Sequence, residues 1–67
     1  MTGKEWIAAF AASLGSEPPD DATIETLLEL ASVAAHASER IAAPLGCFLV
    51  GQSGVDPVDA LSRARYL

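Results

Sequence analysis

Three polar residues that can carry chemistry stand close together in the sequence. His36, Glu39 and Arg40 lie within five positions of one another, near the end of a predicted long helix. An imidazole beside a carboxylate is a common arrangement for general acid–base catalysis and for pH switches. Catalysis would also need a nucleophile or a second catalytic group, which the sequence does not supply. We therefore expect no enzyme activity and interpret the three residues as a polar patch that contacts a partner protein.

A structural interpretation of the same residues is open as well. Arg40 is placed to donate hydrogen bonds to the last carbonyls of the long helix. Glu39 is placed to accept them from the first N–H groups of the next helix, while His36 holds the corner between the two. Both interpretations put the three side chains at one helix–helix corner.

The remaining reactive groups do not form a recognisable site. Cys47 is the only cysteine, so an intrachain disulfide is excluded, and one cysteine with one histidine does not make a zinc site. A helix N-terminus would lower the pKa of this thiol, but we interpret Cys47 as a small packing residue. The segment 51–54 lacks the spacing and the Lys–Ser/Thr pair of a phosphate loop, so we predict a turn. We expect no directly bound cofactor or metal.

The hydrophobic periodicity predicts an all-α fold, a compact bundle of four helices in a single domain over residues 1–67. A strand over 48–50 is rejected because the chain offers no second strand to pair with it. The long helix is expected to be central and the last two helices short. Capping and breaking residues place the helices at about 3–14, 22–42, 44–52 and 57–66.

The supply of large apolar side chains is small for an independent fold. Only 17 of the 67 residues are Leu, Ile, Val or Phe, while 13 are alanines, so the core is barely sufficient. Trp6, the largest hydrophobic residue, is expected to anchor the core, with an interface hot spot as the alternative. Val33, Val50 and Leu67 fall outside the predicted core faces, which indicates an exposed apolar strip. We therefore include Trp6 and Val50 among the candidate partner-binding residues.

The charge balance limits the kinds of partner. Four Lys and Arg residues against nine Asp and Glu residues give a net charge of −5, which disfavours nucleic acids and anionic membrane surfaces. No segment is long and apolar enough to span a bilayer. The N-terminal residues lack the layout of a signal peptide, and the single cysteine has no disulfide partner. These features predict a cytoplasmic protein that binds another protein.

The run from Leu30 to Gly51 resembles the central signature of a small helical domain of unknown function found in actinobacterial proteins. The resemblance rests on the spacing His36-x-x-Glu39-Arg40-x-x-x-Pro44 and on the alanine-rich helix that begins near Trp6. Domains of this kind occur alone or attached to molybdenum cofactor guanylyltransferase-like domains. They also occur near formate dehydrogenase and its sulfurtransferase-type maturation factor.

The resemblance implies a biological context rather than a reaction. It suggests a non-catalytic accessory protein or small subunit that binds a molybdenum- or tungsten-dependent oxidoreductase of the formate dehydrogenase type. The enzyme that matures its molybdopterin cofactor is the other expected partner, and in either case the molybdopterin belongs to the partner. The alternative is a module that binds a small molecule, nucleotide or pterin, with Arg40 and the next helix N-terminus gripping an anionic group at the corner. The shortage of cations counts against it.

Overall fold

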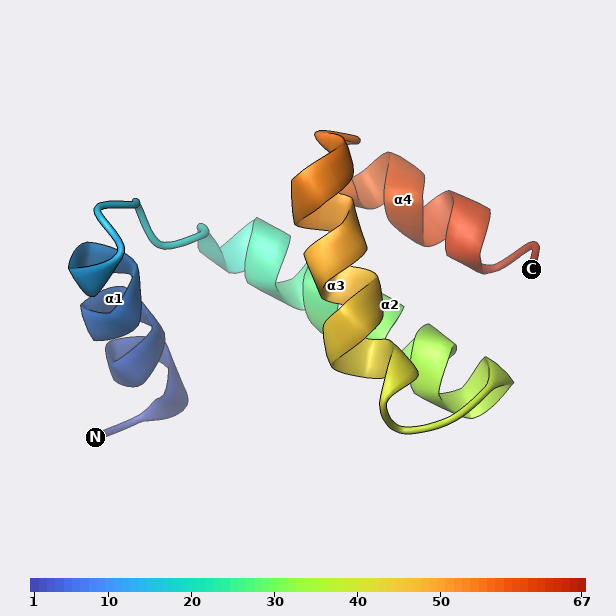
Figure 1. Ribbon diagram of the computed structural model, residues 1–67, viewed down its shortest axis with the longest axis horizontal. Coiled ribbons are helices and arrows are strands. Elements are labelled where there is room, and N and C mark those ends of the chain that lie inside the picture. The colour runs from blue at the N-terminus through green and yellow to red at the C-terminus, as the bar shows by residue number, and fades with distance from the viewer.

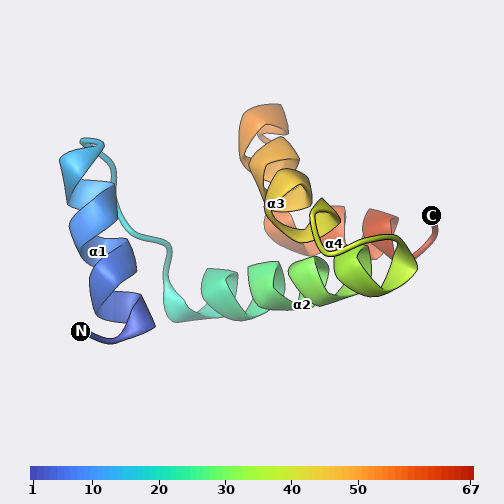
Figure 2. The ribbon, with the colours of Figure 1, turned by 60° about the horizontal axis from the view of Figure 1, so that its bottom comes forward.

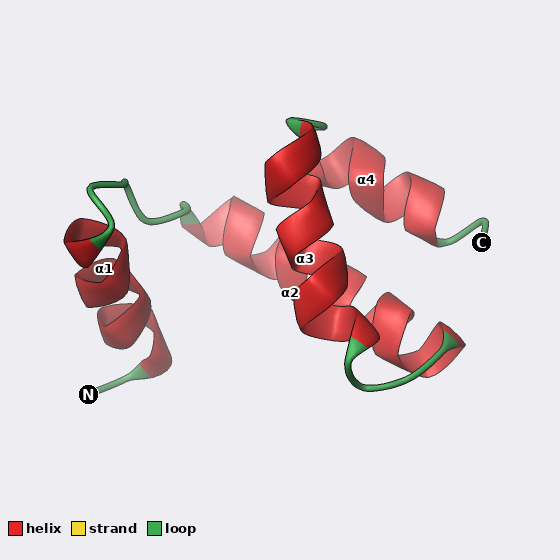
Figure 3. Ribbon diagram, in the orientation of Figure 1, coloured by secondary structure: helices red, strands yellow, loops and turns green.

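The computed structural model describes residues 1–67 and consists of four helices joined by loops, without a strand (Figures 1 and 3). The predicted all-α fold is therefore confirmed, as is the helical assignment of residues 48–50. The helices are α1 (Gly3–Ser13), α2 (Asp21–Ala37), α3 (Ala42–Ser53) and α4 (Pro57–Ala64). None of them has the length and hydrophobicity required to cross a membrane.

Side-chain caps fix where three of the helices begin. At α1, the Thr2 hydroxyl accepts the N–H of Glu5 at 3.1 Å, and the Glu5 carboxylate accepts the N–H of Thr2 at 2.7 Å. Asp20 caps α2 by accepting the N–H of Thr23 at 2.8 Å. Asp56 caps α4 through a first-turn N–H at 3.1 Å. Each cap satisfies a backbone donor that the helix leaves unpaired, so these residues fix the helix starts at Gly3, Asp21 and Pro57.

The corner between α2 and α3 differs from the prediction. The helix expected over 22–42 ends at Ala37, because Ser38 adopts φ −141° and ψ −105°, outside the helical region. The next helix begins at Ala42 rather than at Pro44, so the proline occupies the third helical position. A proline is tolerated there because first-turn N–H groups have no partner within the helix.

The end of α3 also extends beyond the predicted boundary. The turn expected over 51–54 is helical as far as Ser53, and only Gly54 leaves the helix, with a φ of +73°. A left-handed conformation is unfavourable for residues with a Cβ atom, so glycine suits this position. The hydroxyl of Ser53 donates to the Val50 carbonyl at 2.9 Å and accepts the Val55 N–H at 3.1 Å.

The central helix α2 carries both C-terminal helices, as the sequence predicts (Figure 2). Leu30 on α2 is 3% exposed and Leu61 on α4 is 8% exposed, which makes them the most deeply placed large side chains. Gly46 lets α3 approach α2 closely, because a Cβ atom there would lie 3.7 Å from Leu30 and 3.8 Å from Ala34. The small side chain of Ala34 on α2 thus has a packing role.

Helix α1 stands apart from the unit formed by α2, α3 and α4 (Figures 1 and 2). Its side-chain link to α2 is an exposed ion pair of 3.0 Å between Lys4 and Asp21, a type of contact that contributes little stability. Trp6 stacks on Phe10 with ring centroids 4.9 Å apart, yet it remains 52% exposed. The expectation that Trp6 anchors the core is therefore wrong. The intervening loop contains Pro18–Pro19, which favours an extended chain and holds α1 away.

Acidification is expected to weaken the start of α2 through Asp20. Hydrogen bonding to the side chain and the backbone N–H of Thr23 holds the pKa of the Asp20 carboxyl below its ordinary value of 3.8. A lowered pKa in the folded state gives a stabilisation that is complete above the ordinary pKa and is lost as the pH falls through the lowered one. The melting temperature, followed by circular dichroism, should therefore fall more for the wild type than for Asp20→Ala on acidification below about pH 4.

Glu17→Ala is the control for this titration, since Glu17 is an exposed carboxylate in the same loop that caps no helix. Its melting temperature should follow the wild-type curve. If Asp20→Ala also follows that curve, the cap makes no measurable contribution.

Candidate functional site

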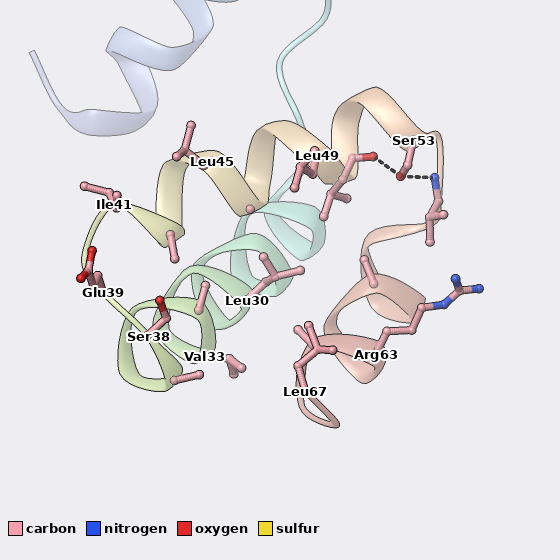
Figure 4. A pocket seen from close by; sticks show the side chains of 18 residues that line it. Leu30, Val33, Ser38, Glu39, Ile41, Leu45, Leu49, Ser53, Arg63 and Leu67 are labelled. Carbon is pink, nitrogen blue, oxygen red and sulfur yellow. Dashed lines mark hydrogen bonds between the residues drawn. The ribbon is translucent and has the colours of Figure 1, made fainter.

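Helices α2, α3 and α4 enclose an open apolar groove of about 840 Å³ (Figure 4). Its floor includes Leu30, and its walls come from the C-terminal half of α2, from α3 and from α4. The charged residues at its edge are Glu39 and Arg63, and Arg63 is paired with Asp59 at 3.1 Å. The groove thus offers an apolar surface with little free charge. The larger apolar side chains along the groove include Val33, Ile41, Leu45, Leu49, Val50 and Leu67.

The groove brings together the three aliphatic residues that the sequence places outside the predicted core faces. Val33, Val50 and Leu67 all line it, although they belong to different parts of the chain. Val33 and Val50 are half-buried, whereas Leu67 is fully exposed. The predicted apolar strip is therefore confirmed, and its shape is a groove.

Residues 42–51 of helix α3 are apolar around the whole circumference of the helix. One side, with Gly46, Cys47 and Val50, is half-buried against α2. The other side exposes Phe48 by 63% and Leu45 by 57%. A helix that is apolar on all sides is normally enclosed by other elements. In this chain the second side of α3 is uncovered.

The polar corner lies directly before α3. His36 donates from Nδ1 to the carbonyl oxygen of Ser32, 2.7 Å away, so Nδ1 carries a proton and Nε2 has no hydrogen-bond partner in the chain. The side chains of Glu39 and Arg40 form no hydrogen bond or ion pair, and α3 has no side-chain cap. The N–H of Ala42 is satisfied instead by the Glu39 backbone carbonyl at 2.9 Å.

The structural interpretation of this corner is therefore wrong for Glu39 and Arg40. Three of the four cationic side chains are engaged in ion pairs, Lys4 with Asp21, Arg63 with Asp59 and Arg65 with Glu29. Arg40 is the one that remains unpaired. The corner presents a free imidazole nitrogen, a free carboxylate and a free guanidinium to solvent.

Cys47 is a packing residue, as the sequence suggests. It lies in the second turn of α3 rather than the first, where a helix N-terminus would have activated it. Its Sγ is 3.8 Å from the Leu27 carbonyl oxygen, and burial raises the pKa of the thiol. A raised pKa reduces the thiolate fraction and with it the reactivity. No three His, Cys, Asp or Glu side chains gather in a way that would hold a metal ion.

The candidate residues from the sequence form three groups rather than one patch. His36, Glu39 and Arg40 share the corner, and Val50 lies in the groove. Trp6 is on α1, at the opposite end of the molecule (Figure 1).

Sequence reasoning missed that Phe48 and Leu45 point outward. The signal was present, because apolar residues occupy every side of residues 42–50 and one adjoining helix covers only one side.

A protein-family model described as "Domain of unknown function (DUF6457)" matches residues 1–64. The match includes α1 and all the helices that form the groove. No curated protein and no solved structure matches the chain.

Proposed function

Since the chain belongs to the DUF6457 family of domains of unknown function, we propose its role from its surfaces, as a non-catalytic accessory protein or small subunit. It docks onto a larger protein through a surface that we call the corner surface. This surface consists of the free polar residues before α3 and the outward apolar residues of α3. Its members are His36, Glu39, Arg40, Ile41, Pro44, Leu45 and Phe48.

The uncovered side of α3 is the observation that carries this proposal. Phe48 and Leu45 are more than half exposed in a helix whose residues 42–51 are all apolar. A contiguous apolar area beside charged residues matches the usual composition of a protein interface, with an aromatic centre and a polar rim. Phe48 is suited to the centre, and Arg40 to the rim.

The proposed partner is based on the resemblance of the segment 30–51 to domains associated with molybdenum enzymes. We propose that the partner is a molybdenum- or tungsten-dependent oxidoreductase of the formate dehydrogenase type, or the enzyme that matures its molybdopterin. The acidity of the chain, with a net charge of −5, favours a basic docking area on the partner. The molybdopterin stays in the partner.

Binding of an anionic pterin or nucleotide at the corner has less support. Arg40 does not line the groove, and the lining cation Arg63 is already paired. An anion in the groove would meet mostly apolar side chains and the carboxylate of Glu39. The geometry favours a protein surface over an anionic small molecule at this corner.

Affinity capture with the tagged full chain from a lysate of its own host tests the proposal. The molybdopterin content of the captured material is measured by the fluorescence of its oxidised pterin. Phe48→Ala is expected to lower the amount of captured molybdopterin about tenfold or more. Truncation of an aromatic residue at the centre of an interface removes most of the binding energy that this residue contributes. Arg40→Ala should lower it several-fold.

Lys4→Ala is the matched control for Arg40→Ala, because it removes a cation from α1, away from the corner surface. It should leave capture unchanged. Capture of no molybdopterin-containing protein by the wild type would refute the partner assignment. Equal capture by Phe48→Ala and the wild type would refute the corner surface.

A further inference from the structure

We infer that the groove between α3 and α4 binds helix α1 of a second copy of this chain, so that two copies exchange their α1 helices. This goes beyond the proposed partner, which uses the corner surface. The basis is that one chain carries both an amphipathic helix that nothing covers and an apolar groove that nothing fills.

The apolar face of α1 has the composition of a docking helix. Trp6, Ile7, Phe10 and Leu14 recur at helical spacing and are 52%, 39%, 46% and 65% exposed. Such a face is the kind of anchor that helix-in-groove recognition uses. The helix has 11 residues and is therefore about 16 Å long, close to the ~18 Å of the α3 wall.

The area that would be covered suits a stable dimer. An aromatic side chain offers ~150–250 Å² and an aliphatic one somewhat less, so the exposed part of this face amounts to roughly 400 Å². An exchange covers that face and the smaller exposed lining of the groove twice, which gives roughly 1,300 Å² in total. Specific protein interfaces commonly bury about 1,200–2,000 Å².

The charge of α1 does not oppose its binding in the groove of a second copy. Lys4 and Glu5 are the charged residues of α1 and cancel each other. The five excess negative charges of the chain lie in residues 17–67. A neutral helix enters the groove of an acidic copy without adding to the repulsion between copies.

The α1 helix that fills the groove must come from another copy, because the position of the groove keeps α1 of the same chain from reaching it. The groove lies between α3 and α4, over the C-terminal half of α2. In two views α3 stands between α1 and α4 (Figures 1 and 2), so α1 would have to cross α3 to reach its own groove. The loop 14–20 spans at most about 25 Å, and Pro18–Pro19 resists folding back. Reciprocal exchange closes the pair with twofold symmetry.

The single tryptophan makes the exchange directly observable. Trp6 is the only tryptophan of the chain, so its fluorescence reports on the environment of α1 alone. The experiment combines sedimentation of the full chain with Trp6 emission, from millimolar to submicromolar protein. The expected result is a dimer with blue-shifted emission, which dissociates on dilution as the emission shifts to the red.

Two variants separate the groove from the corner surface. Leu49→Glu places a charge in the groove at a side chain that is already 59% exposed, so the fold survives. It should raise the dissociation constant of the dimer about ten- to one-hundredfold. Phe48→Ala, one residue away but outside the groove, should leave dimerisation unchanged while it reduces capture of the proposed partner.

Three results would overturn the exchange. The first is a monomer at every concentration with solvent-exposed Trp6 emission. The second is a monomer with blue-shifted emission that dilution does not alter, which shows that α1 covers its own groove. The third is a dimer that Leu49→Glu does not weaken.

Discussion

Leu30→Ala is expected to unfold most of the chain at physiological temperature. Leu30 is 3% exposed and lies where α3 approaches α2. A Cβ atom added at Gly46 would lie 3.7 Å from the Leu30 side chain. Truncation of a buried leucine costs about 2–5 kcal/mol, because it removes apolar contact and leaves a cavity. A domain of this size holds roughly 3–5 kcal/mol in total. Urea unfolding followed by circular dichroism at a fixed protein concentration measures the loss.

Leu28→Ala is the matched control on the same helix. It makes the same chemical change at a side chain that is 65% exposed, where substitutions usually change stability by less than about 0.5 kcal/mol. Its unfolding midpoint should stay near that of the wild type. Equal losses for the two variants would mean that Leu30 is not the centre of the core.

Local signals in the sequence predict the helices well. Thr2, Asp20 and Asp56 each mark a helix start because their oxygens accept N–H groups only a few residues away. Interactions within a few positions of the chain can be inferred from spacing alone. The end of α3 is predicted less well, because the turn expected over 51–54 is helical as far as Ser53 and only Gly54 is left-handed.

The α2–α3 corner shows where local signals are insufficient. Pro44 predicts a helix start, yet the break lies at Ser38 and the new helix begins at Ala42. Both segments have good helix propensity, so the position of the break depends on how α3 packs against α2. That depends on the close approach at Gly46, a contact distant in sequence.

The candidate site was only partly predictable for the same reason. Helical periodicity identifies the apolar face of α1 and the strip that includes Val33 and Val50, but periodicity does not say what covers a face. Trp6 was expected in the core because large aromatic residues are usually enclosed. Which faces stay uncovered depends on how the helices are arranged in space.

These uncovered faces also explain why the polar corner is free to bind. Arg40 has no ion-pair partner while the other cations do, and Phe48 lies on the open side of the helix that follows. The groove and the corner surface share Glu39, Ile41 and Leu45, whereas Phe48 lies outside the groove. Substitution of Phe48 can therefore affect the partner surface without changing the groove.

Gly46 is expected to give opposite results with a small and a large substitution. A Cβ atom there would meet Leu30 at 3.7 Å and Ala34 at 3.8 Å, which is ordinary van der Waals contact. Gly46→Ala should therefore stabilise the chain by about 0.5–1 kcal/mol, because alanine restricts the unfolded chain and favours helix. Gly46→Leu should destabilise it by about 1–3 kcal/mol, since the added atoms wedge α3 away from α2.

Gly51 is the control position, because it lies in the same helix and a Cβ atom added there would have no neighbouring atom within 4 Å. Alanine and leucine at Gly51 should both raise the melting temperature by a few degrees, as about 1 kcal/mol corresponds to ~4–8 °C in so small a domain. Only at Gly46 should alanine and leucine change the stability in opposite directions. If Gly46→Leu were as stable as Gly51→Leu, α3 would not be held against α2 at this point, and the groove that depends on that contact would lose one of its walls.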